Sequence, residues 1–580
     1  MERLKRLARV VLRAMQTSVA SSPASTLPGA LLDAVRSRWV KGVQLRSEEH
    51  FALIVSFAWL ALYNVRFWEQ AAGAMWHGTP RSALFLVSLF ALSLSAQALL
   101  LLLMPMRRLM LAVASACFIV AAASSYFSLE YGAVMNKDML RNVFETDVAE
   151  TEALMTVELW LRVILMGVVP ALLVWKVRLP RRSWAMQLRR RSIAIGALLA
   201  VCAVALLSSA ASYAVFFREH KPVRFLLTPA APVSSALGLL FDEQRHGQGP
   251  FVNASGVAER SAPPQPRPLV LVLVVGETAR AANFQLGGYA RPTTPQLAAI
   301  DGLVYFPQTT SCGTSTAISV PCMFSHLPRS EFDVEDAPRY ANLLDALKSA
   351  SVDVEWRENN SGCKGVCARV AQIDYTGRCG KTACFDEVML EDLPARLNDV
   401  HHDTVIVMHQ VGSHGPAYTE RYPAAAERFK PACRSNELQR CTKEEVVNAY
   451  DNTIAYTDQV LARAIGALRD ASGRVDAALM YVSDHGESLG EGGVYLHGVP
   501  YAFAPEAQTH VPMLMWLSPA YVRRSHIDLQ CLAAYAEQPF SHDNVYHTVL
   551  GAAEVRNASY DRSLDILSHC RTPALPPDHE

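Results

Sequence analysis

The 580-residue sequence has no excess of charge of either sign, because 54 Lys and Arg side chains balance 54 Asp and Glu side chains. Proteins that bind nucleic acid through its phosphates carry a basic surface, so this balance argues against a nucleic-acid partner. The chain also lacks internal repeats. At this length a single compact core is not expected, and we predict about two to four domains.

Apolar runs of about twenty residues are absent after residue 260, but five such runs occur before residue 220. They cover roughly residues 51–67, 82–104, 109–129, 158–177 and 192–217. Each is long enough for a helix that crosses a bilayer. One such run alone could be a buried core helix. Five in succession, separated by charged connectors, predict an α-helical membrane domain of five spans in contact with the lipid bilayer.

A cleavable signal peptide is not evident, because the first apolar run lies too far from Met1. We expect that run to be an uncleaved anchor. The connectors after the second and fourth runs are basic, whereas the connector after the third run is acidic. Basic connectors tend to stay in the cytoplasm, so the N-terminus is predicted to be cytoplasmic. The fifth span then delivers the C-terminal domain to the other side.

Cysteine usage supports this placement, because ten of the twelve cysteines lie in the C-terminal region. They are Cys312, Cys322, Cys363, Cys367, Cys379, Cys384, Cys433, Cys441, Cys531 and Cys570. An even set on the predicted extracytoplasmic side indicates disulfides, with metal binding as the alternative. We expect neighbours to pair, which leaves Cys531 with Cys570. The predicted compartment is oxidising, and a bacterial periplasm fits best, which places the protein in the inner membrane.

The composition divides the chain into a membrane domain at 1–217, a bridging helix and linker at 218–267, and a periplasmic domain at 268–580. The proline-rich stretch SAPPQPRP marks the end of the linker. Three apolar, β-branched runs follow: LVLVLVVGE, TVIVMHQVGSHG from Thr404, and DAALMYVSDHGE from Asp476. Helical patterns lie between them. Alternating strands and helices predict a soluble, doubly wound α/β domain.

Each of the three apolar runs ends in side chains that can bind metal or titrate. These residues are Glu277, His409, His414, Asp484, His485 and Glu487. Ligands bind where parallel strands end, so we expect these side chains to converge. An aspartate and a histidine could merely cap a loop. With Glu277 on another strand and His497 nearby in sequence, the pattern instead favours a catalytic Zn²⁺ site.

The stretch TTSCGTSTAISVPCMFS is rich in hydroxyl groups, and a Cys312–Cys322 bridge is expected within it. Its pattern predicts a turn that opens a short helix, where backbone N–H groups suit a phosphate. A hydroxyl bound to Zn²⁺ loses its proton more easily and becomes a nucleophile. Spacing alone does not choose among Thr314, Ser315 and Thr316, and a plain Ser/Thr-rich turn is the alternative for each of them.

Five motifs carry a resemblance to a known family. They are VVGETAR at 274–280, SCGTSTAISVPCMFS at 311–325, NNSGCKGV at 359–366, MHQVGSHGPAY at 408–418 and SDHGESLGEGGVYLHG at 483–498. The C-terminal domain resembles the alkaline phosphatase/sulfatase superfamily. From the first span to about residue 550, the chain resembles the bacterial lipid A phosphoethanolamine transferases, which include the mobile colistin-resistance enzymes.

The resemblance implies that Thr316 is the nucleophile and that Glu277, Asp484, His485 and Thr316 bind zinc. The positions implied to line the substrate pocket are Thr314, Asn360, Lys364, His414, Glu487 and His497, and His409 is a further substrate-binding candidate. Some of these positions can hold a second zinc. Lys364 would neutralise phosphate charge, unless it is simply solvated. His414 or His497 would act as general acid or base.

One further stretch, MLRNVFETDVAE, places Asn142, Thr146 and Glu150 on one face of a helix. It resembles the family helix that faces the lipid headgroup, although an ordinary exposed amphipathic helix has the same pattern. The implied reaction moves phosphoethanolamine from phosphatidylethanolamine to lipid A through a phosphoethanolamine–threonine intermediate, which confers resistance to cationic peptides such as polymyxin. We expect a monomer.

Several alternatives stay open at this point. The same chemistry could act on core heptose or on periplasmic glucans, or the chain could be a phosphoglycerol transferase or a hydrolase of the same superfamily. A sulfatase would carry a Cys or Ser where this chain has Thr316. An inactive sensor on a membrane anchor belongs to a different class, and the intact set of metal-binding residues argues against it.

Overall fold

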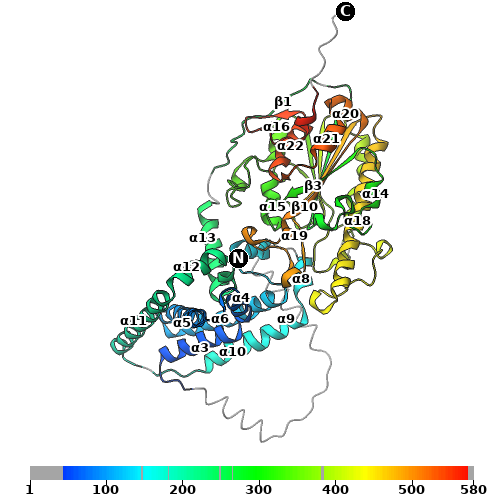
Figure 1. The fold of residues 1–580 in the computed structure, drawn as a ribbon. Helices are drawn as coiled ribbons and strands as arrows, with labels where there is room; N and C mark the ends of the chain where they lie inside the picture. The colour runs from blue at the N-terminus through cyan, green and yellow to red at the C-terminus, as the bar shows by residue number, and fades with distance from the viewer. Residues whose placement is uncertain are drawn as a thin grey trace, which may run out of the picture.

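The computed structural model describes residues 44–145, 148–180, 182–246, 250–263, 265–379 and 384–572. Within these ranges a layer of apolar helices lies below an α/β domain (Figure 1). The helical layer comes from the first part of the chain, and the sheet domain comes from the part after residue 268. The predicted fold class is confirmed.

Four helical segments in the described ranges are each long and apolar enough to cross a membrane. They are α5 (Pro80–Leu102), α6 (Arg107–Glu130), the continuous segment Val157–Lys176 and α11 (Trp184–Ser208). These segments match four of the five predicted spans closely. The Val157–Lys176 segment joins α9 (Val157–Arg162) and α10 (Val169–Lys176) through a π-helical stretch, η1 (Val163–Val168).

The π-helical stretch has a local cause. Pro170 has no N–H to donate to the carbonyl of Met166, four residues earlier. The Tyr63 hydroxyl donates to that carbonyl instead. A π-helical stretch inside an α-helix is rare and is often found at functional sites.

The first predicted span, over residues 51–67, folds as two helices. They are α3 (Glu48–Leu62) and α4 (Val65–Met75), which meet at an angle of 71°. Asn64 stabilises the bend, because its side chain donates to Trp59 O and Thr228 O and accepts from Thr228 N–H. The described helices therefore give five apolar spans when this bent pair counts as one.

Further helices lie between the membrane spans or follow the last of them. They are α7 (Lys137–Glu145), α8 (Val148–Leu154), α12 (Ala210–Glu219) and α13 (Ala230–His246). Helix α7 packs against α13 and against α15 (Thr316–Met323) of the sheet domain. Helix α13 lies within the predicted bridging segment, and the exact domain boundaries at residues 217 and 267 stay predictions.

The α/β domain is built on one eight-stranded sheet in the order β11-β3-β10-β7-β2-β6-β4-β5. The strands are β2 (Leu269–Gly276), β3 (Leu303–Thr310), β4 (Asp353–Glu358), β5 (Ala371–Asp374), β6 (Thr404–His409), β7 (Asp476–Ser483), β10 (His510–Leu517) and β11 (Phe540–Ser541). Strand β10 pairs antiparallel with both of its neighbours, and the other pairs are parallel.

The three apolar runs found in the sequence are the three adjacent strands β7, β2 and β6 at the centre of this sheet, and every residue of each is buried. Alternate residues of β2 enter two different hydrophobic cores. One core includes α16 (Leu343–Ser349) and α22 (Asp543–Ala552), and the other includes α18 (Lys443–Asp470). These helices cover opposite faces of the sheet, as a doubly wound fold requires (Figure 1).

All ten cysteines of the C-terminal region form disulfides. The bonds are Cys312–Cys322, Cys363–Cys367, Cys379–Cys384, Cys433–Cys441 and Cys531–Cys570. The predicted pairing of neighbours is confirmed, including the more distant pair at the C-terminal end. Cross-links of this kind stabilise a fold mainly by restricting the unfolded chain, and they form in oxidising compartments.

Candidate active site

The candidate site lies where the central parallel strands end. Glu277 follows β2, His409 is the last residue of β6, and Asp484 and His485 follow β7. In the sheet register Val275 pairs with His409 and Gly276 with Ser483, so the three strands end side by side. All four of these side chains are buried. The predicted convergence at one edge of the sheet is confirmed.

Three of the predicted metal ligands form a tight cluster. Each of Glu277, Asp484 and His485 offers one ligand atom, and these atoms lie within 4.8 Å of one another. The Thr316 hydroxyl completes the group, because it donates to the two carboxylate oxygens of Glu277 at 3.0 and 3.1 Å. It also lies 3.3 Å from His485 Nε2. The four residues expected to bind zinc are therefore in contact.

The surrounding backbone orients the cluster. His485 Nδ1 lies 3.0 Å from the carbonyl oxygen of Gly486, so it is the protonated ring nitrogen, and Nε2 faces the carboxylates. Asp484 Oδ1 accepts the backbone N–H groups of Thr278 and His485 at 3.2 and 2.7 Å. Asp484 Oδ2 is buried and accepts no hydrogen bond from the described residues. That oxygen lies 3.2 Å from His485 Nε2, so one cation can contact both atoms.

The charges of the cluster also favour a bound cation. Burial raises the pKa of Asp484 to about 6, and the nearby Glu277 carboxylate contributes to the increase. Burial alone would lower the pKa of His485, but the Asp484 and Glu277 carboxylates raise it to about 10. Two buried carboxylates thus compete for one imidazole. A divalent cation would supply the missing positive charge, and this set of oxygen and nitrogen donors suits zinc.

The three candidate hydroxyls occupy different positions. Thr316 is the first residue of α15 and lies in the cluster. Thr314 instead donates to Val499 O at 2.7 Å, and the buried Ser315 hydroxyl has no hydrogen-bond partner among the described residues. The N-terminal end of α15 carries the positive end of the helix dipole. Thr316 therefore combines contact with the cluster and a position that favours a phosphate.

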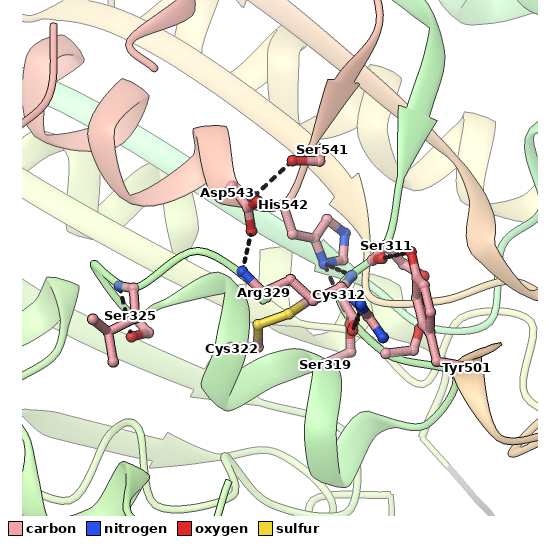
Figure 2. The surroundings of a disulfide bond; sticks show 12 residues. Ser311, Cys312, Ser319, Cys322, Ser325, Arg329, Tyr501, Ser541, His542 and Asp543 are labelled. Carbon is pink, nitrogen blue, oxygen red and sulfur yellow. Dashed lines mark hydrogen bonds between the residues drawn. A yellow bond between two sulfur atoms is a disulfide. The ribbon is translucent and has the colours of Figure 1, made fainter. Parts of the chain in front are cut away.

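The residues behind α15 were not recognised as site residues from the sequence. His542 accepts the Cys312 N–H through Nδ1 at 3.1 Å (Figure 2). It also donates to Ser483 O through Nε2 at 2.9 Å. Burial lowers the pKa of His542 to about 4, which fits this neutral pattern of one acceptor and one donor. Ser319 donates to the carbonyl of Asp484. These contacts join the Cys312–Cys322 loop and α15 to the end of β7.

A second layer of polar side chains surrounds Glu277. Asn360 donates to Glu277 Oε2 at 2.6 Å and to Gln410 O at 2.8 Å, and it lies 3.2 Å from His409 Nε2. His409 Nδ1 donates to Glu358 Oε1 at 3.0 Å. The fully buried His409 ring thus lies behind Glu277, and its predicted contact with substrate stays a prediction. Glu358 was not recognised in the sequence.

Two further histidines lie near the cluster. The ring centre of His497 is 4.5 Å from that of His485 and 5.1 Å from that of His414. His497 Nδ1 lies 3.0 Å from Glu487 Oε2, and the Tyr418 hydroxyl donates to Glu487 Oε1 at 2.8 Å. Burial lowers the pKa of His414 to about 4. The structure therefore brings these three predicted pocket residues together next to the cluster.

The remaining predicted residues are less completely described. Lys364 is half-buried within the Cys363–Cys367 loop, and its ammonium group donates to Ser361 O at 3.1 Å. Asn142 lies on α7, the helix that packs against α15. Thr146 and the side chain of Glu150 lie outside the described residues. The shared helix face of these three residues stays a prediction.

Comparison with known proteins identifies the family. A model described as Sulfatase matches residues 270–555, and a model described as Phosphoethanolamine transferase EptA/EptB matches residues 93–243. Phosphoethanolamine transferase EptA of Escherichia coli (strain K12) is 38% identical over 530 residues, which cover 90% of this chain and 96% of that protein. The chain belongs to the phosphoethanolamine transferase family. It is therefore an enzyme of the transferase class, and the predicted resemblance is confirmed.

Other relatives agree with this assignment. Phosphatidylethanolamine transferase Mcr-1 of Escherichia coli is 41% identical over 415 residues, which cover 69% of this chain and 76% of that protein. The solved integral membrane lipooligosaccharide phosphoethanolamine transferase A from Neisseria meningitidis is 36% identical, with a TM-score of 0.87. That match covers 92% of this chain and all of the solved chain, so both the helical layer and the α/β domain follow the phosphoethanolamine transferase fold.

Proposed function

We propose that this phosphoethanolamine transferase moves phosphoethanolamine from phosphatidylethanolamine to lipid A through a covalent intermediate on Thr316. The observation that carries the proposal is the position of the Thr316 hydroxyl, which lies in the Glu277–Asp484–His485 cluster at the start of α15. Relatives support the choice of substrates. One is named a phosphatidylethanolamine transferase and another a Kdo(2)-lipid A phosphoethanolamine 7''-transferase.

Zinc is the proposed cofactor, with Glu277, Asp484, His485 and the Thr316 oxygen as its ligands. A bound zinc ion lowers the pKa of a hydroxyl ligand and stabilises charge on a phosphoryl group. The unsatisfied Asp484 Oδ2 and the excess of buried carboxylate charge support this assignment. A second ion during turnover would find its ligands among His414, Glu487 and His497, which lie beside His485.

In the first step, the Thr316 oxygen attacks the phosphorus of the donor lipid. A new P–O bond forms to Thr316, the P–O bond to the glycerol breaks, and diacylglycerol leaves once its oxygen is protonated. The backbone N–H groups at the start of α15 stabilise the phosphoryl oxygens. In the second step, an oxygen of lipid A attacks the same phosphorus and displaces Thr316. His414 or His497 transfers the protons, because both rings lie next to the cluster.

Lys364, Asn360 and Thr314 are proposed to contact the phosphoryl group, and Asn142, Thr146 and Glu150 to contact the ammonium end of the donor. The transferred group carries one phosphate charge and one ammonium group. Where it is added to a phosphate of lipid A, that phosphate loses its second negative charge, and the net negative charge of lipid A falls. Cationic peptides such as polymyxin then bind less tightly, because their attraction is largely electrostatic. We place the protein in the bacterial inner membrane as a monomer, with a cytoplasmic N-terminus and a periplasmic catalytic domain. The five disulfides support an oxidising compartment.

The test is mass spectrometry of lipid A from cells that express the wild-type chain, Thr316→Ala or Ser315→Ala. The serine variant is the matched control, because its neighbouring hydroxyl makes no hydrogen bond with the described residues. Wild type and Ser315→Ala should add phosphoethanolamine to lipid A, and Thr316→Ala should not. Full modification by Thr316→Ala would refute the nucleophile assignment. Unmodified lipid A beside a modified core sugar would show that the acceptor is different.

A further inference from the structure

A cavity with a volume of about 700 Å³ lies where the membrane-spanning segment Val157–Lys176 meets the catalytic domain. One wall comes from residues 156–166, in α9 and η1, and the other comes from residues 420–440. Its volume is in the range of small-molecule binding sites, ~300–1,000 Å³. None of the candidate active-site residues lines it. The cavity is therefore a separate feature of the molecule.

The membrane-side wall exposes apolar side chains. Leu161 is 54% exposed and Leu165 is 63% exposed, and both line the cavity. They belong to a helical segment that is long and apolar enough to cross a bilayer, so their exposed surfaces face lipid chains. Leu165 lies in the π-helical stretch η1. The cavity thus opens beside the acyl-chain region, at the end of the span nearest to the catalytic domain.

The remaining lining carries equal numbers of opposite charges. The charged residues are Glu158, Arg162, Glu420, Arg434, Glu437 and Arg440, which are three arginines and three glutamates. Both walls contribute to the set, since Arg440 pairs with Glu158 on the membrane side at 2.8 Å and with Glu437 on its own wall at 2.6 Å. A wall of this composition offers partners to both a cation and an anion.

Two of the three arginines, Arg434 and Arg162, take no part in the ion pairs of Arg440. Arg434 pairs with Glu427, which does not line the cavity, at 2.7 Å. Arg162 Nη1 is buried and makes no hydrogen bond with the described residues, and the carboxylate nearest to it in an ion pair, that of Glu130, is 4.0 Å away. These two guanidinium groups are suited to a phosphate.

We propose that this cavity binds the headgroup of a zwitterionic glycerophospholipid. Arg162 and Arg434 would contact its phosphate, Glu420 and Glu437 its ammonium group, and Leu161 and Leu165 its acyl chains. The balanced charge disfavours a purely anionic headgroup, because each anionic lipid would also meet three carboxylates. The binding is independent of the proposed catalytic reaction, since the cavity and the metal cluster share no residue.

Photo-crosslinking of the full-length Thr316→Ala protein in nanodiscs tests this site without consuming a lipid donor. The probes are phosphatidylethanolamine and phosphatidylglycerol with a diazirine near the glycerol end of one acyl chain, each in competition with the other lipid unlabelled. Peptides containing residues 157–166 should be labelled, and phosphatidylethanolamine should be preferred about fivefold, the effect of one charge near the membrane surface. No label on these peptides, equal competition by phosphatidylglycerol, or displacement by lipid A would overturn the proposal.

Two opposite charge changes sharpen the test. Glu420→Gln leaves the cavity with a net positive charge and should shift the preference toward phosphatidylglycerol by about fivefold. Arg434→Gln leaves it net negative and should shift the preference the other way. Arg469→Gln, on an exposed residue at the far end of α18, is the matched control and should change nothing. Misfolding does not produce opposite shifts in two variants, so unchanged ratios or shifts in the same direction would contradict the site.

Discussion

The Glu277–Asp484–His485 cluster and the ring of polar residues around it contain the same kinds of side chain but differ in how their charges are satisfied. This ring consists of Glu358, Asn360, His409, Glu487 and His497. In the cluster, one imidazole faces two buried carboxylates, and Asp484 Oδ2 accepts no hydrogen bond from the described residues. In the ring, two histidines each have a carboxylate partner: His409 pairs with Glu358, and His497 pairs with Glu487. The cluster therefore suits an added cation, whereas the ring pairs its own charges and can orient groups or transfer protons.

The strongest test of this difference is Asp484→Asn. The amide oxygen can still accept the N–H groups of Thr278 and His485, so the loop should fold, but the ligand charge is lost. We expect the zinc affinity to fall more than about 100-fold, because even an indirect partner of a metal ligand contributes about 10–100-fold. Transfer to lipid A should fall to background. Metal content by mass spectrometry of the purified protein and a lipid A assay measure the two effects.

Asp458→Asn is the control for this variant. Asp458 is also buried and accepts the backbone N–H groups of Gln296 and Leu297 at 3.1 and 2.8 Å, but it lies outside the cluster. Burial raises its pKa to about 6, so a neutral side chain is well tolerated there. It should keep its zinc. Normal zinc content in Asp484→Asn would remove the distinction between the cluster and the ring.

For a histidine outside the cluster, we expect activity to fall while the zinc content stays unchanged. His497→Gln removes a ring next to His485 but none of the atoms in the Glu277–Asp484–His485 cluster. We expect the first zinc ion to stay bound and the transfer rate to fall about 10²–10⁴-fold, the usual contribution of a general acid or base. Metal content and single-turnover kinetics with a labelled donor lipid measure this. Loss of zinc together with activity would place His497 in the cluster instead.

The cluster itself could be predicted from sequence because its residues follow apolar strands. Glu277, Asp484 and His485 come directly after the runs that became β2 and β7, and parallel strands end at one edge of a sheet. The choice of Thr316 needed more than the sequence pattern. The contact that distinguishes Thr314 is with Val499, 185 residues later in the chain, and no local signal shows such a pairing.

Other features depended on long-range contacts in the same way. His542 follows a two-residue strand and lies in no motif, yet it contacts Ser483, 59 residues earlier. The bend between α3 and α4 is invisible to hydropathy, because the apolar run continues through it. Asn64 stabilises this bend through hydrogen bonds between its side chain and the backbone of Thr228, which is distant in the sequence. The sequence predicted which elements form, and tertiary contacts decided how they bend and what supports them.

Asn360 tests the boundary between the two regions, because it belongs to the ring but contacts a residue of the cluster. Asn360→Ala removes the 2.6 Å hydrogen bond to Glu277 Oε2 without removing a ligand. We expect the zinc affinity to fall about 10–100-fold, less than in Asp484→Asn, with activity restored by added zinc. A titration of activity against free zinc measures the effect. If excess zinc restores no activity, Asn360 contributes to the reaction through the substrate rather than through Glu277.

Ser319 should show the smallest effect, because it supports the cluster only through the backbone. Its hydroxyl donates to the carbonyl of Asp484, so Ser319→Ala leaves a buried acceptor with one partner fewer. We expect thermal unfolding to report a loss of stability of about 1–3 kcal/mol, while the rate at saturating zinc changes less than tenfold. Ser315→Ala, four residues earlier, removes a hydroxyl without a described partner and should leave stability nearly unchanged. Equal destabilisation by the two variants would mean that loss of any hydroxyl near the start of α15 is enough, and that the link from Ser319 to the end of β7 has no special role.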